Sequence, residues 1–85
     1  MSARPYVEIR RPLADGGAWL GYHHAVLLDS DGNILRVSYP LDALVAARLL
    51  PAEVAELPWL EGAQLAAARR QAWVCVRSIR MEERR

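Results

Sequence analysis

The sequence predicts an α+β fold: a mostly antiparallel sheet of about four strands, with two to three short helices packed on one face. Three observations predict this class. A hairpin pattern occupies residues 19–39, an alternating strand precedes it, and three helical segments and a last strand follow, in the order β-β-β-α-α-α-β. Residues 1–85, of which 53% are hydrophobic and 25% charged, are expected to form a single globular domain with residues 81–85 as a frayed tail.

The first strand is predicted at residues 5–11, where Val7 and Ile9 alternate with polar side chains and so face one side of a sheet. Pro5 and Pro12 bracket this segment. Because proline cannot donate a hydrogen bond to a neighbouring strand, the segment is expected at the edge of the sheet.

The hairpin is the clearest signal in the chain. Its two β-rich runs flank Asp31-Gly32, and glycine adopts the positive φ of a tight turn without strain. Residues 19–39 are therefore expected to form the frame that the rest of the chain covers.

The length of the turn sets the register of the hairpin. A two-residue turn pairs Leu28 with Leu35 and Val26 with Val37, whereas a three-residue turn would shift the register and bring Arg36 onto the apolar face. Since a slip of one residue exchanges the two faces of a strand, the burial pattern favours the two-residue turn.

This register gives the hairpin two apolar faces. One is expected to meet the helices and comprises Leu20, Tyr22, His24, Val26, Leu28, Leu35, Val37 and Tyr39. The other comprises Trp19, His23, Ala25, Leu27 and Ile34. It has no obvious cover in so short a chain, so this second face is where a partner is expected.

Three helices are predicted after the hairpin. The first begins after Pro40 and ends at or before Leu50, because Pro51 follows. Pro51 can begin a short second helix over residues 51–57, and the third is predicted over residues 60–72. The helical stripe of the first helix comprises Leu41, Leu44, Val45, Arg48 and Leu49.

The last strand is predicted at residues 73–80, with Trp73, Cys75 and Ile79 on one side. It begins apolar on both faces and is therefore expected inside the sheet. Cys75 is expected to be buried and inert. As the only cysteine it cannot form an intrachain disulfide, which favours a reducing compartment.

Charge is unevenly distributed, although the net charge is only +1. Acids dominate residues 29–61 and arginines dominate residues 69–85, and these two segments are expected to face each other across the fold. No signal peptide is recognised, and no apolar run approaches the roughly 20 residues that span a bilayer. The protein is therefore expected to be cytoplasmic, without a membrane partner.

His23 and His24 are the first residues to consider for catalysis or metal binding. Neighbours in a strand point to opposite faces, so the pair cannot hold one ion together. His24 is expected to pair with the Tyr39 hydroxyl, and His23 to lie at a surface or interface. No catalytic residue, metal ligand or cofactor is predicted. A metal-dependent or hydrolytic enzyme that uses His23 or His24 is kept as a third alternative.

A DNA-binding regulator is the second alternative. Residues 51–72 could form a helix-turn-helix followed by a strand that resembles a wing. Pro58 and Trp59 in the turn, Glu61 at the start of the second helix and the near-neutral charge argue against it. The residues that would contact nucleic acid are Gln64, Arg69, Arg70, Arg77 and Arg80.

The leading hypothesis is a small non-enzymatic module that binds another protein, or a second copy of itself as a homodimer. Size and architecture alone are analogous to regulators and inhibitors encoded by phages and mobile elements, among them inhibitors of CRISPR complexes. The protein would then regulate or inhibit a larger complex. Trp, Tyr and Arg are enriched at interfaces, and the interface candidates are Trp19, His23, Leu27, Ile34, Arg36 and Trp59.

Overall fold

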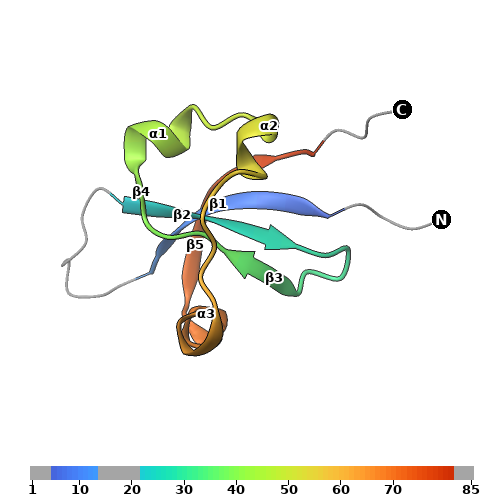
Figure 1. Cartoon of the computed structure of the whole chain (residues 1–85), viewed down its shortest axis with the longest axis vertical. Helices are drawn as coiled ribbons and strands as arrows, with labels where there is room; N and C mark the ends of the chain where they lie inside the picture. The colour runs from blue at the N-terminus through green and yellow to red at the C-terminus, as the bar shows by residue number, and fades with distance from the viewer. Residues whose placement is uncertain (1–4, 14–21, 82–85) are drawn as a thin grey trace.

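The computed structural model describes residues 5–13 and 22–81 of the chain. The α+β class and the order of its strands and helices are confirmed. In chain order the elements are β1 (Tyr6–Pro12), β2 (Tyr22–Leu28), β3 (Ile34–Val37), β4 (Leu41–Asp42), α1 (Ala43–Ala47), α2 (Pro51–Val54), α3 (Gly62–Arg70) and β5 (Trp73–Ile79) (Figure 1).

All strand pairings are antiparallel, and the order across the sheet is β3-β2-β1-β5, with β4 paired to the start of β2. β1 therefore lies inside the described sheet, and the prediction of an edge strand is wrong. Pro12 is tolerated because it is the last residue of β1, where it faces Trp73, and a proline disrupts a sheet mainly in the middle of a central strand. β5, predicted inside the sheet, is at its edge.

The hairpin turn has three residues inside its flanking pair, so the predicted two-residue turn is wrong. The Asp29 N–H donates to the Asn33 carbonyl at 3.0 Å, and Gly32 within the turn has a φ of 86°. One carboxylate oxygen of Asp29 accepts from the backbone N–H of Asn33 at 2.9 Å and of Asp31 at 2.8 Å. The bond from Asn33 contributes most to the lowered pKa of Asp29, because it favours the charged carboxylate.

A second irregularity restores the register beyond the turn. Val26 faces Val37, as predicted, but the register then shifts so that Leu28 faces Ile34. Leu35 is the extra residue of this β-bulge and is 40% exposed. The extra residue in the turn and the extra residue in the bulge cancel each other, so the register beyond the bulge is the predicted one. The predicted pairing of Leu28 with Leu35, which lies between the two, is wrong.

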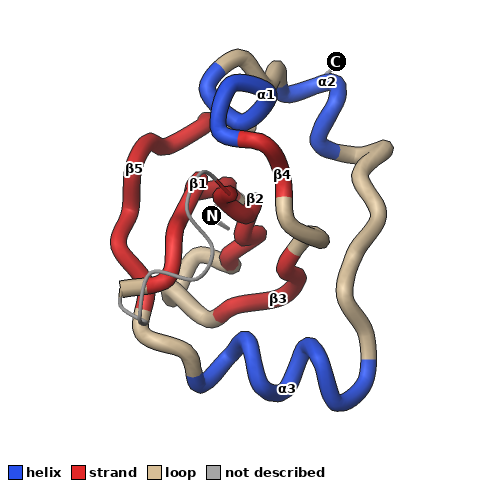
Figure 2. The backbone as a smooth tube through the Cα atoms, turned by 90° about the vertical axis from the view of Figure 1, so that its left-hand side faces the viewer, coloured by secondary structure: helices blue, strands red, loops and turns tan. Residues whose placement is uncertain are grey.

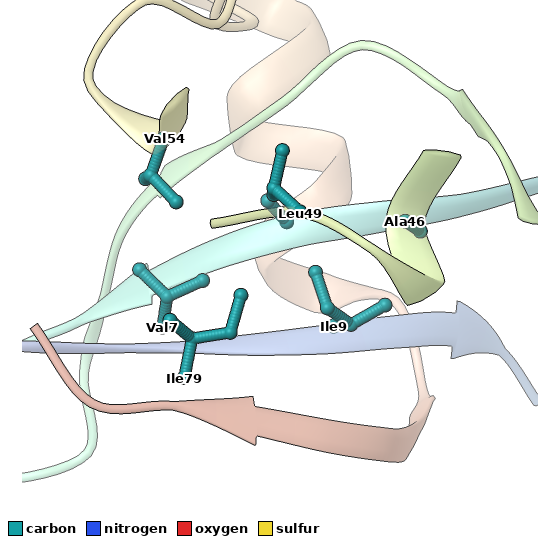
Figure 3. Close-up of a cluster of buried hydrophobic side chains, with 7 residues drawn as sticks. Val7, Ile9, Ala46, Leu49, Val54 and Ile79 are labelled. Atoms are coloured by element: carbon teal, nitrogen blue, oxygen red, sulfur yellow. The ribbon is translucent and has the colours of Figure 1, made fainter. Parts of the chain in front are cut away.

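Helices cover both faces of the sheet rather than one. In Figures 1 and 2, α1 and α2 lie above the strands and α3 lies below them. We call the two groups of buried side chains the upper and the lower cluster. The upper cluster comprises Val7, Ile9, Ala25, Ala46, Leu49, Val54 and Ile79 (Figure 3). The lower cluster comprises Val26, Leu28 and Val37, with Tyr6, Ile34, Leu60, Leu65, Ala68 and Trp73 packed against it.

The second face of the hairpin is therefore covered, and Ile34, predicted on that face, packs against the lower cluster on the other one. Ala25 is fully buried, and Leu27 packs against the upper cluster beneath α1 and α2. A hairpin that is apolar on both faces needs cover on both, and the connection between α2 and α3 carries the chain from one face to the other. The expectation that this face is open to a partner is wrong.

A bulge in β5 reverses the face of the sheet toward which its odd-numbered side chains point. The register against β1 shifts in mid-strand and leaves Val76 as the extra residue. Trp73 consequently packs against the lower cluster, whereas Ile79 belongs to the upper one. Cys75, predicted to be buried, is an exposed free thiol.

The helices are shorter than predicted. The Asp42 carboxylate accepts from the Leu44 N–H at 2.8 Å and begins α1, which ends at Ala47. Pro51 begins α2, and the Glu53 carboxylate accepts from the N–H of the preceding Leu50 at 2.8 Å. No helix in the described ranges is long and apolar enough to cross a membrane.

Candidate functional site

Ser38 holds the junction between β3 and β4 together. Its N–H donates to the Ala25 carbonyl at 2.9 Å, and its fully buried Oγ accepts from the Ala25 N–H at 2.9 Å. The hydroxyl in turn donates to the Tyr39 carbonyl at 2.8 Å. The backbone N–H and the hydroxyl of Ser38, the backbone N–H and carbonyl of Ala25 and the carbonyl of Tyr39 therefore all have hydrogen-bond partners, although regular pairing breaks here.

His24 is held by the same junction. Its Nδ1 lies 2.8 Å from the Ser38 carbonyl oxygen, which can only accept, so the ring carries its proton on Nδ1. The Tyr39 hydroxyl, predicted as its partner, does not have this role. The Trp73 ring meets the imidazole edge-on at 5.2 Å. Burial lowers the pKa of His24 and outweighs the opposing effect of the Ser38 bond, so the fold favours the neutral form of His24.

Two adjoining hollows of about 350 and 370 Å³ open beside His24. Both are lined by Pro12, His24 and Pro40. No serine, cysteine or carboxylate lines either one, so the described walls offer His24 no partner for hydrolysis. A wall of this kind suits an uncharged, apolar group. The remaining lining residues are Tyr22, Tyr39, Leu60, Gln64, Ala67, Ala68, Gln71 and Trp73.

His23 lies on the opposite face of β2 and pairs with Leu41 of β4. Its buried Nδ1 has no hydrogen-bond partner among the described residues. Within the same residues, no group of three histidine, cysteine or acidic side chains is placed to hold a metal ion. The two neighbouring histidines thus face separate surroundings, as the strand geometry predicts.

Three of the four most exposed large apolar side chains in the described chain lie in α1 or just after it, and we call these three the α1 surface. Leu44 is 69% exposed, Val45 53%, and Leu50, just beyond the helix, 58%. The inward residues of the same segment are Ala46 and Leu49, which belong to the upper cluster (Figure 3). The prediction that Leu44 and Val45 belong to the buried stripe is wrong.

Several predicted residues gather along β3. The Arg36 guanidinium lies over the Trp59 ring, 5.7 Å from its centre. The Arg69 Nε donates to the Ile34 carbonyl at 3.2 Å and so ties α3 to the start of the strand. Trp59 itself forms a β-bridge with Ser38. Interface candidates and one nucleic-acid candidate thus share this edge of the sheet.

The other interface candidates lie elsewhere. His23 and Leu27 are half-buried on the face that α1 and α2 cover, so neither stands out on the surface. Trp19 lies outside the described residues. The interface role of Arg36 and Trp59 stays a prediction.

Arg77 is part of the fold. Its Nη1 donates to the Ala46 carbonyl at 2.7 Å and its Nη2 to the Leu49 carbonyl at 3.0 Å. It thereby holds the end of α1, and the residues that follow it, against β5. Its guanidinium faces the protein and not an exposed nucleic-acid surface.

The remaining nucleic-acid candidates do not form one surface with Arg77. Gln64 lines a hollow beside His24, while Arg70 and Arg80 are exposed. The predicted helix-turn-helix is not formed, because α2 packs on the upper cluster through Val54 and α3 on the lower one through Leu65. DNA binding by individual arginines stays a prediction.

Salt bridges do not join the acidic and basic segments within the described residues. The ion pair found there links Arg10 to Glu8 at 2.7 Å, both in β1. Arg69 and Arg77 instead donate to backbone carbonyls. For these two arginines the expected pairing with the acidic segment is wrong.

Comparison with family models, curated proteins and solved structures finds no match to this chain. What the protein does is therefore argued from the surfaces that its fold presents.

The α1 surface is the functional candidate that sequence reasoning missed. Pro40 and Pro51 leave room for fewer than three helical turns, and in so short a helix two different stripes fit the pattern equally well. The signal that distinguishes them is Ala46, since a helix of this length packs closely on a sheet through a small side chain.

Proposed function

We propose that the protein is a non-enzymatic module that binds another protein and acts as a regulator or inhibitor of a larger complex. One observation carries the proposal: Leu44 and Val45 of α1, and Leu50 three residues after the helix ends, are each more than half exposed. Large apolar side chains that are exposed within one short segment are candidates for a binding surface.

Folding alone does not account for the orientation of α1. A surface helix normally turns its large apolar side chains toward the core, whereas α1 turns Ala46 inward and Leu44 and Val45 outward. Moving one such side chain from water to a buried site contributes about 1.5–3 kcal/mol. A partner that covers this surface would gain that contribution.

Two further features favour binding over catalysis. Besides His24, the walls of the two hollows present proline, aromatic, aliphatic and amide side chains and no acid or arginine. Tyr22 and Tyr39, which line them, are 49% and 43% exposed. Aromatic side chains on a surface are enriched at protein interfaces.

Affinity capture from lysate of the native host, followed by mass spectrometry, tests the proposal when two variants accompany the wild type. Leu44→Asp combined with Leu50→Asp places charge on the α1 surface. Leu35→Asp makes the same change at a leucine on the hairpin that is 40% exposed. We expect the wild type and the Leu35→Asp variant to recover the same protein complex, and the double variant to recover at least about tenfold less.

The three proteins should have the same far-UV circular dichroism, because substitutions of exposed side chains change stability by only about 0.5 kcal/mol. Equal recovery by the double variant would contradict binding through α1. Recovery of nucleic acid in place of a protein, with loss on Arg69→Ala, would favour the DNA-binding alternative.

A further inference from the structure

β5 presents an open edge of the sheet. Among the described residues it pairs only with β1. The opposite edge, at β3, is partly closed because the Leu60 N–H donates to the Val37 carbonyl at 2.8 Å and the Tyr39 N–H to the Pro58 carbonyl at 3.2 Å. An open edge carries backbone donors and acceptors that can pair with another strand.

The direction of these groups follows from one hydrogen bond. The Leu13 N–H donates to the Ala72 carbonyl at 2.9 Å, just before β5 begins. In an antiparallel pair, residues point their N–H and C=O alternately toward and away from the partner strand. Trp73 and Cys75 therefore point theirs to the open edge, and Val74 points its own toward β1. The bulge at Val76 ends this alternation.

We propose that two copies of the chain pair edge to edge through β5, antiparallel, about a two-fold axis at Val74. In this register Trp73 of each copy faces Cys75 of the other, so all the outward backbone groups of both residues find partners. Val74 faces Val74 of the second copy at a pair without hydrogen bonds, where Cα atoms approach to about 4.5 Å.

The absence of charge and proline from this edge favours a second copy of the chain as its partner. Natural edge strands are protected from self-pairing by charged side chains or prolines, and residues 72–76, Ala-Trp-Val-Cys-Val, contain neither. The nearest charge, on Arg77, is already turned toward the carbonyls of Ala46 and Leu49. No like charges therefore meet within the paired segment.

The dimer would place both α1 surfaces on the same side of one continuous sheet, because the two-fold axis is perpendicular to the sheet. The bulge limits the paired segment to a few residues, so we expect a weak dimer that depends on protein concentration. Two α1 surfaces on one side would bind a partner bivalently. That last step alone rests on the proposed function.

Disulfide trapping tests the register directly. Val74→Cys in a Cys75→Ser background should form an intermolecular disulfide under mild oxidation, since the expected Cα separation is within the range that a disulfide bridges. Val76→Cys in the same background is the matched control. Its two thiols would lie roughly 13 Å apart along the strand and should not cross-link. Cross-linking of the control instead of the Val74→Cys protein would overturn the register.

Sedimentation equilibrium tests the dimer without a thiol. The wild type should change from monomer to dimer as its concentration rises, and Val74→Lys should remain a monomer because two charges would then face each other. Val76→Lys should still dimerise. A wild type that stays monomeric at every concentration would overturn self-pairing. A Val74→Lys variant that no longer captures a partner protein, while its oligomeric state is the same as that of the wild type, would overturn it too. The second result would assign the edge to a strand of another protein.

Discussion

A single buried hydroxyl lets the hairpin change its pairing from β3 to β4. Ser38 accepts from the Ala25 N–H and donates to the Tyr39 carbonyl, so a break in regular pairing leaves these groups bonded. His24 bonds to the carbonyl of the same residue. Residues of this kind act through hydrogen bonds that periodicity does not reveal, which is why the sequence predicted the wrong partner for His24.

Ser38→Ala should lower the free energy of unfolding by about 1–3 kcal/mol, because the buried Ala25 N–H loses its side-chain acceptor. Urea denaturation followed by circular dichroism measures this. Ser78→Ala, the same change at an exposed position of β5, is the control and should alter stability by no more than about 0.5 kcal/mol. Equal effects at both positions would refute the role assigned to Ser38.

His24 should make the protein less stable in mild acid. Burial lowers its pKa in the folded state below the reference value of 6.5, so the unfolded state binds the proton more readily. The free energy of unfolding should therefore fall as the pH drops from about 7.5 to about 5.5. His24→Asn, whose amide can still donate to Ser38, should reduce this slope. Identical slopes in the two proteins would exclude His24 as the cause.

At the scale of elements, the sequence predicted the three helices and every strand except the short β4, whose Leu41 was expected in the first helix, but it did not predict the β-bulges. The alternation in β1 and the Asp31-Gly32 turn signal were sufficient to place the first two strands. The bulges at Leu35 and Val76 shift the register, but each adds only one residue to its strand and so has no recognisable pattern in the sequence. The edge and interior strands were exchanged for two reasons. The prolines that bracket the first strand indicated an edge, and the apolar start of the last strand indicated an interior position.

The Arg77 guanidinium joins β5 to the end of α1, and removing it should lower the stability of the protein. Arg77→Ala should lower the free energy of unfolding by about 1.5–3 kcal/mol, since hydrogen bonds from a charged donor to the Ala46 and Leu49 carbonyls are lost. Arg77→Lys should recover only part of that, because an ammonium lacks the planar fork that reaches both carbonyls. Urea denaturation of these variants beside the exposed-site control Arg80→Ala checks the result. An unchanged midpoint for Arg77→Ala would contradict the clamp.

At the scale of the whole molecule, a small sheet is covered on both faces, and this explains which surfaces stay free. The hairpin face that was predicted to be open is covered by α1 and α2. The apolar side chains that are exposed instead include Leu44, Val45 and Leu50, in and just after α1. Sequence patterns could not show this, because they give the period of each helix but not the side of the sheet to which the chain crosses. The candidate site follows from tertiary packing alone.

Binding through the outer surface of α1 is tested most directly by calorimetric titration of the captured partner with three purified proteins. These are the wild type, the Leu44→Asp/Leu50→Asp variant and the Leu35→Asp control. We expect the Kd of the double variant to rise at least about tenfold, because charge replaces two apolar contacts, while the control stays within about twofold of the wild type. The same Kd for all three proteins would contradict the claim.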